Sequence, residues 1–454
     1  MAANTIIRNY TEGNIAKQVL VYSAPFVLSN LLQTFYNLVD MAFIGRFVGQ
    51  VGLSAVSVGG DILNLFTFIC MGFTSVVQII LAQYVGKREY DNVGRTVGTA
   101  SVFILSLGAL FMLIGFAFGG HFLTWMHVPD AARSQARAYT LVCYSGLIFI
   151  FGYNMVSAIQ RGMGDSKTPF LFVALATVIN IVLDYTFIVV MKLEALGAAL
   201  GTVIGQCVAF LCSVVYLYRK RNTFGFRFSG RLFIPNKKIM GIILRLGIPS
   251  TLQFCAINLS GLVVNAFIND IGLTESAVNA VAHKIGNIAS IVTTGLNSAG
   301  AALVGQNFGA GKLDRVKRIM GVVAVASVVF AAILSALLII FPEEIFGIFN
   351  KEEAVLAMCH SYVIVGVLSF FGFASRAPFL ALVNGQGFAA LGFTVGMLDG
   401  VVFRIGISIL LGTVLKMGIT GFWLGSVLAG YTYLFVGGAY FFSGKWRTRP
   451  LAVK

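Results

Sequence analysis

Long apolar runs alternate with short polar segments along the whole chain. The runs centre near residues 30, 67, 107, 147, 180, 207, 258, 290, 330, 368, 400 and 430. At 1.5 Å of rise per residue, a helix of about 20 residues crosses a hydrocarbon core of about 30 Å. The pattern therefore predicts an all-α polytopic membrane protein with about a dozen transmembrane helices. The segment before the first run is too polar for a cleavable signal peptide, so we expect the first helix to remain as the insertion signal.

Composition supports a membrane protein. Hydrophobic residues make up 58% of the 454 residues, and charged residues only 11%. A soluble globular protein of this size could not cover so much apolar surface with so little charge. The chain also carries a net charge of +15, which by itself is compatible with binding to nucleic acid.

The positions of the cations give a different explanation for this charge. One set of alternate loops carries most of them: Lys87, Arg88, Arg95, Arg161, Lys167, the segment 219–245, Lys312, Arg315, Lys317, Arg318 and the tail 444–454. The opposite loops hold few cations, set among acids. Because cytoplasmic loops are enriched in Lys and Arg, we expect both termini on the cytoplasmic side of the cell membrane. The cations orient the chain in the lipid bilayer, and we expect no nucleic-acid partner.

The chain contains an internal repeat. The segment AQYVGKREYDNVGR (82–95) matches GQNFGAGKLDRVKR (305–318), and the two lie 223 residues apart. The repeat predicts two six-helix bundles related by a pseudo-two-fold axis along the membrane normal. Their expected bounds are an N-lobe (1–217), a basic cytoplasmic linker (218–245) and a C-lobe (246–454). Parallel repeats of this kind are typical of secondary transporters, which work by alternating access.

Proline interrupts the first helix of each half. Pro25 aligns with Pro249 when the repeats are superposed. A proline inside a helix removes one backbone hydrogen bond and kinks the chain. Pro25 is therefore a possible hinge, and a static kink is the alternative.

Two apolar runs carry polar stripes that end in carboxylates. In the first run Gln33, Asn37 and Asp40 recur at helical spacing, and in the fifth Asn180 and Asp184 lie four apart. An ionised Asp at the bilayer centre costs about 2.5–3.5 kcal/mol, so it persists where it faces a cavity, a partner or a cation. A shared pocket would let the two acids hold a proton or a monovalent cation. Two structural alternatives remain: Asp40 could be solvated at the membrane surface, and Asn180 could join two helices.

The second half lacks equivalent acids. Aligning segment 161–169 with 383–391 places Asn180 near Phe403 or Arg404, and Asp184 near Ile407 or Ser408. The asymmetry indicates a function assigned to one lobe.

Other polar groups lie in the second half, namely His283, Lys284, Arg376, Asp399 and Arg404. Asp399 and Arg404 are five residues apart, about 140° around an α-helix, so they are not an obvious pair, although Arg404 could neutralise Asp399 from a neighbouring turn or bind an anionic group. A transport role and a structural ion pair both remain open for these groups.

Several stretches together resemble the multidrug and toxic compound extrusion family of the flippase superfamily, in its DNA-damage-inducible-F-like branch. They are PFVLSNLLQTFYNLVDMAFIGRFVG (25–49), LAQYVGKREYDNVGR (81–95), IQRGMGDSKTPFLFVALATVINIVLDYTFIV (159–189) and LGAALGT (196–202). The resemblance implies efflux of amphipathic, often cationic, drugs in exchange for inward H⁺ or Na⁺. It also implies a cation-coupling site at Asp40, Asn180, Asp184 and Thr202. Possible cavity-lining positions are Gln33, Asn37, Tyr139 and Asn154.

Two other functions are the alternatives to multidrug efflux. A lipid-linked oligosaccharide flippase would need cations in its cavity, and Arg376 and Arg404 keep this function open. The acids and amides of the first half instead favour a cationic cargo. An intramembrane enzyme is disfavoured because the four histidines form no HExxH motif, and no GxSxG accompanies Ser290 and Lys284. No GxxxxGK[ST] loop is present, so we expect no direct use of ATP and no cofactor. A possible Na⁺ at the coupling site is the only metal expected.

Overall fold

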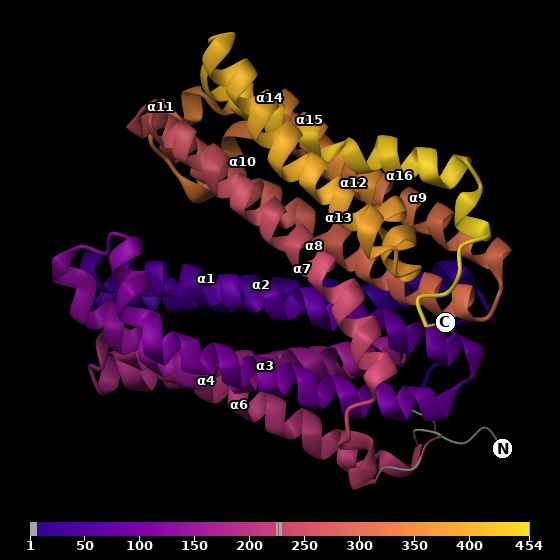
Figure 1. Ribbon diagram of the computed structural model, residues 1–454. Coiled ribbons are helices and arrows are strands. Elements are labelled where there is room, and N and C mark those ends of the chain that lie inside the picture. The colour runs from indigo at the N-terminus through magenta and orange to yellow at the C-terminus, as the bar shows by residue number, and fades with distance from the viewer. Residues whose placement is uncertain (1–6, 224–225, 227–228, 454) are drawn as a thin grey trace. The chain divides into compact units, whose positions relative to one another are not determined.

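The structure, a computed structural model, describes residues 7–223, 226 and 229–453. Within this part of the chain all regular elements are helices, and 12 of them are long and apolar enough to span a membrane. The prediction of an all-α fold with about a dozen transmembrane helices is therefore confirmed (Figure 1).

The first half contains α1 (Ile15–Phe47), α2 (Gln50–Lys87), α3 (Tyr90–Trp125), α4 (Asp130–Gly162), α5 (Lys167–Asp184), the π-helix η1 (Tyr185–Val190) and α6 (Glu194–Arg219). The connection holds the short 3₁₀ helices η2 (Arg221–Thr223) and η3 (Gly230–Phe233). The second half continues with α7 (Lys237–Asn269), α8 (Leu273–Gly309), α9 (Leu313–Ile340), α10 (Pro342–Phe349), α11 (Glu353–Ala357) and α12 (Cys359–Gly385). It ends with α13 (Ala389–Met397), η4 (Leu398–Ile405), α14 (Gly406–Ile409), η5 (Leu410–Val414), α15 (Gly418–Gly430), α16 (Thr432–Phe442) and η6 (Lys445–Arg447).

The contacts divide the chain into two compact units. The first unit is built from residues 28–251, and the second from residues 10–27 and 252–452. In the first unit α4 packs against α2, α3 and α6, and in the second α12 packs against α8, α9 and α15. The contact boundaries differ from the bounds expected from the sequence, because the start of α1 joins the second unit and the start of α7 joins the first.

Apolar packing explains the placement of these two helix starts. Val19, Tyr22 and Phe26 of α1 are buried in a core that includes Leu296 and Leu303 of α8. The chain leaves this core after Val27, two residues beyond Pro25 in the sequence. Pro25 thus lies just before the point at which α1 passes from one unit to the other, and its role as a hinge stays a prediction.

The first half of α7 is bound in the same manner in the first unit. Gly247 lies so close to Phe73 of α2 that an added Cβ would be 2.2 Å from its ring. The backbone N–H of Asn236 donates to the hydroxyl of Thr99 on α3 (3.0 Å). The start of α7 therefore lies within the stretch that the sequence assigned to a basic linker.

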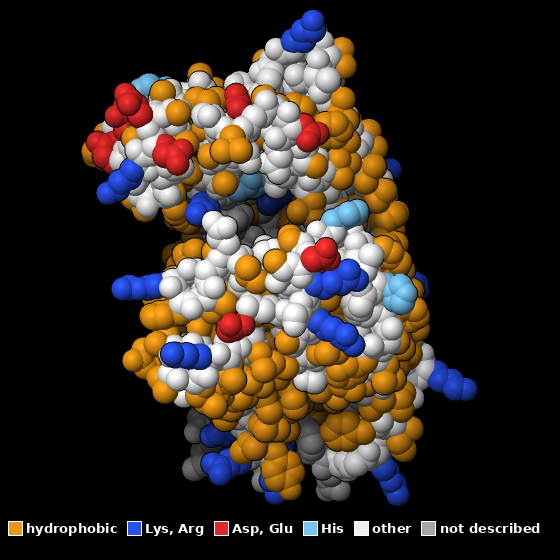
Figure 2. Space-filling model, turned by 90° about the vertical axis from the view of Figure 1, so that its left-hand side faces the viewer, with side chains coloured by type: hydrophobic (Ala, Val, Ile, Leu, Met, Phe, Trp, Pro, Cys, Tyr) orange, Lys and Arg blue, Asp and Glu red, His pale blue; other side chains and the backbone are white. Residues whose placement is uncertain are grey.

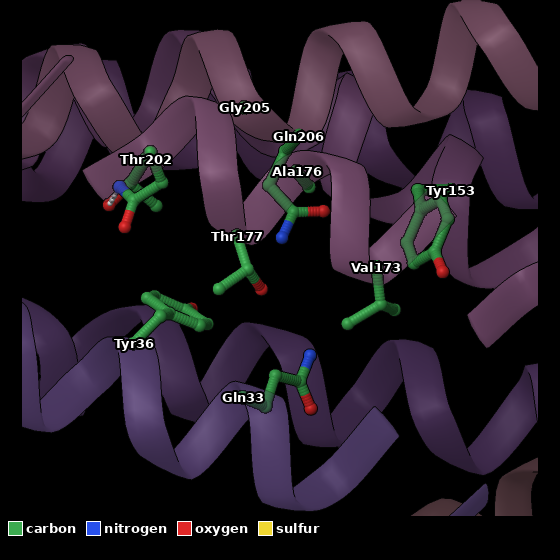
Figure 3. A pocket seen from close by; sticks show the side chains of 10 residues that line it. Gln33, Tyr36, Tyr153, Val173, Ala176, Thr177, Thr202, Gly205 and Gln206 are labelled. Carbon is green, nitrogen blue, oxygen red and sulfur yellow. Dashed lines mark hydrogen bonds between the residues drawn. The ribbon is translucent and has the colours of Figure 1, made fainter. Parts of the chain in front are cut away.

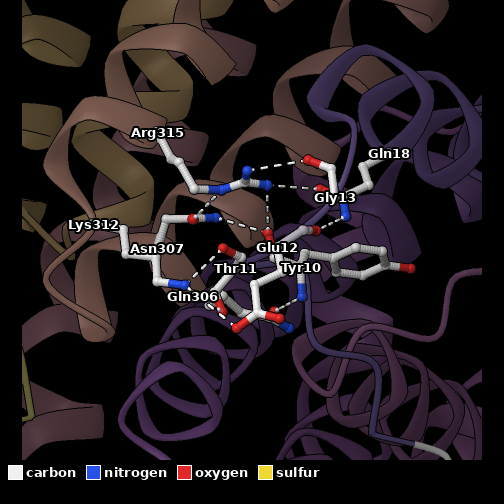
Figure 4. A network of polar contacts seen from close by, with 9 residues as sticks. All are labelled: Tyr10, Thr11, Glu12, Gly13, Gln18, Gln306, Asn307, Lys312 and Arg315. Carbon is white, nitrogen blue, oxygen red and sulfur yellow. Dashed lines mark hydrogen bonds and ion pairs between the residues drawn. The ribbon is translucent and has the colours of Figure 1, made fainter.

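A polar network anchors the segment before α1 to the second unit (Figure 4). The Arg315 guanidinium donates to the carbonyls of Gly13 (3.1 Å) and Tyr10 (3.3 Å), to the Gln18 side chain (3.2 Å) and to Asn307 (3.1 Å). These contacts give a structural role to the repeated motif at 305–318, which forms the turn between α8 and α9.

Replacement of Arg315 by alanine is expected to destabilise the second unit. It removes several hydrogen bonds from a charged donor, each worth about 1.5–3 kcal/mol, and leaves Oδ1 of the buried Asn307 without this donor. The unfolding midpoint of the purified protein should fall by at least about 3 °C. Arg318→Ala is the matched control, since Arg318 is exposed one turn further along the same helix. Equal midpoints for the two variants would contradict this role.

Acidic side chains gather on the exposed α10 and α11 of the second unit, at the end seen in Figure 2. They are Glu343, Glu344, Glu352 and Glu353. The sequence assigned this loop to the set opposite the basic loops. The two short helices within it were not predicted.

Candidate functional site and family

Helix α5 has one apolar exposed face and one polar buried face. Leu171, Val178 and Val182 are each about 60% exposed (61%, 61% and 58%) and face outward from the unit. Thr177, Asn180 and Asp184 are buried, with Asp184 at 0% exposure. The polar stripe predicted on this helix therefore faces the interior of the first unit and not the surrounding lipid.

The buried face of α5 meets α6 at Thr202. The Asn180 amide lies 3.4 Å from Asp184 Oδ1 and 3.5 Å from Thr202 Oγ1. Gly201 allows this approach: an added Cβ there would lie 2.1 Å from Asp184 Oδ1. Gly201 thus leaves space for the Asp184 carboxylate, and the adjacent Thr202 supplies a hydroxyl group.

Asp40 joins this group from α1. Its side chain is only 7% exposed, so it is not solvated at the surface. It lies within electrostatic range of Asp184, and the carboxylates of Asp40 and Asp184 both lie within electrostatic range of Tyr36. Three of the four residues assigned to the coupling site are thus in contact, and the fourth lies close by.

The three buried side chains leave acceptor oxygens without donors. Asp40 Oδ1, Asn180 Oδ1 and Asp184 Oδ2 are each shielded from solvent and have no hydrogen-bond partner. A buried polar atom of this kind costs free energy unless a proton, water or cation satisfies it. The cluster supplies carboxylate, amide and hydroxyl oxygens, which suit a proton or a hard monovalent cation.

A small cavity of ≈ 20 Å³ opens beside the cluster. Figure 3 shows Gln33 and Tyr36 of α1 facing Thr177 of α5 and Thr202 of α6 across it. Asn180 also lines it, so the cavity adjoins the unsatisfied oxygens. Its volume suits a water molecule or an ion, and no charged side chain lines it.

The predicted lining residues divide into two groups. Gln33 lines the cavity, and buried Tyr139 lies near Asp40 and bonds to Cys143. Asn37 is exposed and does not line the cavity. Asn154 does not line it either, because its amide donates to the Ile150 carbonyl one turn back (2.8 Å).

Sequence reasoning missed Tyr36, Tyr153 and Gln206 as lining residues. Tyr36 lies three residues after Gln33 and four before Asp40, so helical spacing alone could have identified it. Tyr153 reads as part of an apolar run, and its hydroxyl donates to the Pro169 carbonyl (2.8 Å).

Comparison with known proteins identifies the family. The sequence matches the MatE family over residues 25–186 and 249–414, which is more than half of the chain. The chain belongs to the MatE family.

The relatives of this MatE protein are transporters, so the prediction of a transporter and not an enzyme is confirmed. The chain is 26% identical over 425 residues to the probable multidrug resistance protein YoeA of Bacillus subtilis, covering 92% of each chain. It is 30% identical over 309 residues to the probable multidrug resistance protein YpnP of the same organism, covering 68% of each. Its fold superposes with a TM-score of 0.89 on an outward-facing multidrug resistance MATE family transporter of the MOP superfamily. That structure is 20% identical, and the match covers 99% of this chain and 100% of that one. Assignment to one branch of the family stays a prediction.

In the second unit of this MatE protein, Asp399 and Arg404 form the ion pair that the sequence left as one alternative. Arg404 Nη2 donates to Asp399 Oδ1 at 2.9 Å, so the two residues form an ion pair. On an α-helix the two side chains would lie about 140° apart, but residues Leu398–Ile405 form the π-helix η4. A π-helix bonds residue i to residue i+5, which brings side chains five apart onto one face.

Two other polar residues that the sequence singled out in the second unit, His283 and Lys284, have different surroundings. His283 Nε2 bonds to Asn265 Oδ1 (2.7 Å) and lines a cavity with Arg376 and Arg404. Lys284 does not line this cavity and lies 5.6 Å from the Phe349 ring centroid. Of the two adjacent residues, only His283 belongs to the polar cluster.

Proposed function

We propose that this protein is a secondary active multidrug exporter in which buried Asp40 and Asp184 bind the coupling ion. Amphipathic organic cations would leave the cell in exchange for inward H⁺ or Na⁺, by alternating access. The observation that supports this best is the set of buried acceptor oxygens with no donor on Asp40, Asn180 and Asp184. Unpaired polar groups cost free energy inside a membrane, and where they occur they commonly mark an ion or substrate site.

Competition between ion and cargo follows from this arrangement. Two carboxylates in electrostatic contact cannot both stay ionised at low cost, so one proton or cation stabilises the pair. A cationic cargo that approaches the unloaded pair gains the same Coulomb attraction. Binding of the ion therefore weakens binding of the cargo, which is the requirement for exchange.

The cargo class rests on the charge of the first-unit site, whose ionisable groups are the acids Asp40 and Asp184; the adjoining cavity of ≈ 20 Å³ holds only a water molecule or an ion. Its lining contains amides, hydroxyls and aromatic rings and no Lys or Arg. Aromatic faces attract organic cations. A lipid-linked oligosaccharide flippase, which would need cations to meet a pyrophosphate, is the alternative function, because Arg376 and Arg404 line the cavity of the second unit. The names of the relatives, probable multidrug resistance proteins, agree with a drug cargo.

The location we propose is the cell membrane, with both termini in the cytoplasm. The distribution of Lys and Arg among the loops supports this orientation. The experiment is modification of single cysteines introduced at exposed Arg318 and Glu352 with a membrane-impermeant thiol reagent in intact cells. Only the cysteine at 352 should react, and labelling of the one at 318 alone would reverse the orientation.

Transport in inverted membrane vesicles tests the activity. Uptake of a fluorescent organic cation should follow an imposed proton gradient or sodium gradient, applied separately. The gradient that drives uptake identifies the coupling ion. Uptake that responds to neither gradient, in vesicles shown to contain the protein, would contradict ion-coupled export.

A further inference from the structure

The second unit has an open cavity with a volume of ≈ 500 Å³, larger than the ≈ 20 Å³ cavity described in the first unit. It lies among α7, α8, α12, η4 and α15, and we call it the second-unit cavity. Its size falls within the range of about 300–1,000 Å³ found for small-molecule sites. Nothing in the proposed ion-coupling mechanism uses this space.

Arg376 is the most unusual group in the wall of this cavity. It lies on membrane-spanning α12, and its guanidinium carbon is 4.8 Å from the Phe373 ring centroid. The guanidinium forms no hydrogen bond or ion pair with any residue in the described part of the chain. A guanidinium carries five N–H donors and does not lose its charge in proteins. A half-buried one within a membrane span needs an acceptor, and the cavity is the space in which one can bind.

The charges around the cavity do not cancel. Arg404 also lines it, and its one ionic partner is Asp399, which is fully buried behind it. Arg376 lies within electrostatic range of both groups. Two guanidinium groups therefore share one carboxylate, and no Asp or Glu is among the described residues that line the cavity. The Arg404 Nε atom is also buried without an acceptor.

Four polar side chains of the wall are hydrogen-bonded to one another. Trp423 Nε1 donates to Asn279 Oδ1 (3.0 Å), and Asn279 Nδ2 donates to Asn265 Oδ1 (3.1 Å). Asn265 Oδ1 also accepts from His283 Nε2. This hydrogen-bonded network holds the four side chains in place, and the two arginines are the only Lys or Arg residues among the described residues of the wall.

We propose that the second-unit cavity binds an amphipathic organic monoanion through its carboxylate, with Arg376 as the primary ligand and Arg404 beside it. The excess of one positive charge matches a single carboxylate, and the planar guanidinium fork can bind its two oxygens together. The apolar remainder of the ligand would rest on Phe373 and Trp423. The site goes beyond the proposed ion-coupling function and does not depend on it.

Calorimetric titration of the purified full-length protein in neutral detergent tests the site with three probes of matched shape. Naphthoate is the anion, naphthylmethanol the neutral analogue and naphthylmethylammonium the cation. Naphthoate should bind in preference to both others. Arg376→Gln should weaken naphthoate binding by about 10- to 150-fold, because a hydrogen-bonded charge pair is worth about 1.5–3 kcal/mol.

Two control variants make the outcome specific. Arg447→Gln removes an exposed arginine that lies over an aromatic ring (Trp446, 5.4 Å) in the same unit but outside the cavity, and should bind naphthoate normally. Asp184→Asn should also bind it normally, so that failure of the coupling site and failure of this site are distinguishable. Because Arg376 has no hydrogen-bond or ion-pair partner among the described residues to lose, Arg376→Gln should keep its unfolding midpoint to within a few degrees. Naphthoate should raise the midpoint of the wild type but not of this variant.

Two results would overturn the proposal. One is equal affinity of naphthoate for the wild type and a folded Arg376→Gln variant. The other is preference for the alcohol or the ammonium probe over the carboxylate. Displacement of naphthoate by phosphatidylglycerol would instead assign the site to a lipid phosphate and would overturn the choice of a carboxylate.

Discussion

Replacing Asp184 with asparagine is expected to abolish ion-driven drug export while leaving a folded protein in the membrane. Asparagine has nearly the same volume, so the packing against Gly201 is kept, but it neither takes up a proton nor neutralises a cation. The loss of a charged ligand worth about 1.5–3 kcal/mol weakens cation binding by about 10- to 150-fold. The Asp40→Asn variant should fail in the same way, because the two carboxylates share one ion.

The measurement is resistance of a drug-sensitive host, with expression of each variant followed by immunoblot of the membrane fraction. Asp130→Asn is the matched control, since Asp130 is an exposed acid at the start of α4 in the same unit. It should give full resistance. Full resistance in both Asp40→Asn and Asp184→Asn would remove the coupling site.

Gly201→Ala is expected to disrupt the site without touching any of its polar groups. An added methyl group would lie 2.1 Å from Asp184 Oδ1, far inside van der Waals contact, so either the carboxylate or helix α6 must move. Overpacking of this kind costs about 1–3 kcal/mol. Moving Asp184 away from Asn180 and Thr202 should reduce coupled transport by at least about tenfold.

Gly60→Ala separates this effect from a general effect of alanine. Gly60 lies within α2 of the same unit, and nothing lies within 4 Å of a Cβ added there. Alanine favours a helix by about 1 kcal/mol over glycine, so this control should transport normally and be at least as stable. Wild-type transport by Gly201→Ala would show that the close approach of α5 and α6 is not needed.

The sequence predicts the spans and part of the site because both depend on local patterns. Apolar runs of sufficient length identify the helices, and spacings of three and four place Asn180 and Asp184 on one buried face. The same spacing places Gln33 and Asp40 together on α1. What the resemblance adds is Thr202, which no periodicity identifies because a single threonine in an apolar helix is ordinary.

The features that sequence reasoning missed depend on packing between distant segments. Assignment of the start of α1 to the second unit follows from burial of Tyr22 and Phe26 among residues of α8, which no local pattern shows. The ion pair of Asp399 and Arg404 was not obvious from the sequence, because a π-helix cannot be told from an α-helix by composition. The space that Gly201 leaves for Asp184 is visible only when α5 and α6 are packed together.

Ion movement driven by a drug gradient tests the central claim most directly. Purified protein would be placed in liposomes, an outward gradient of an organic cation imposed, and the internal pH and Na⁺ concentration followed with fluorescent dyes. The wild type should move one of the two ions inward as the drug leaves. The Asp40→Asn, Asp184→Asn double variant should release no more drug than protein-free liposomes and move neither ion. Drug-dependent ion movement of wild-type size in the double variant would contradict the assignment of the coupling ion to these carboxylates.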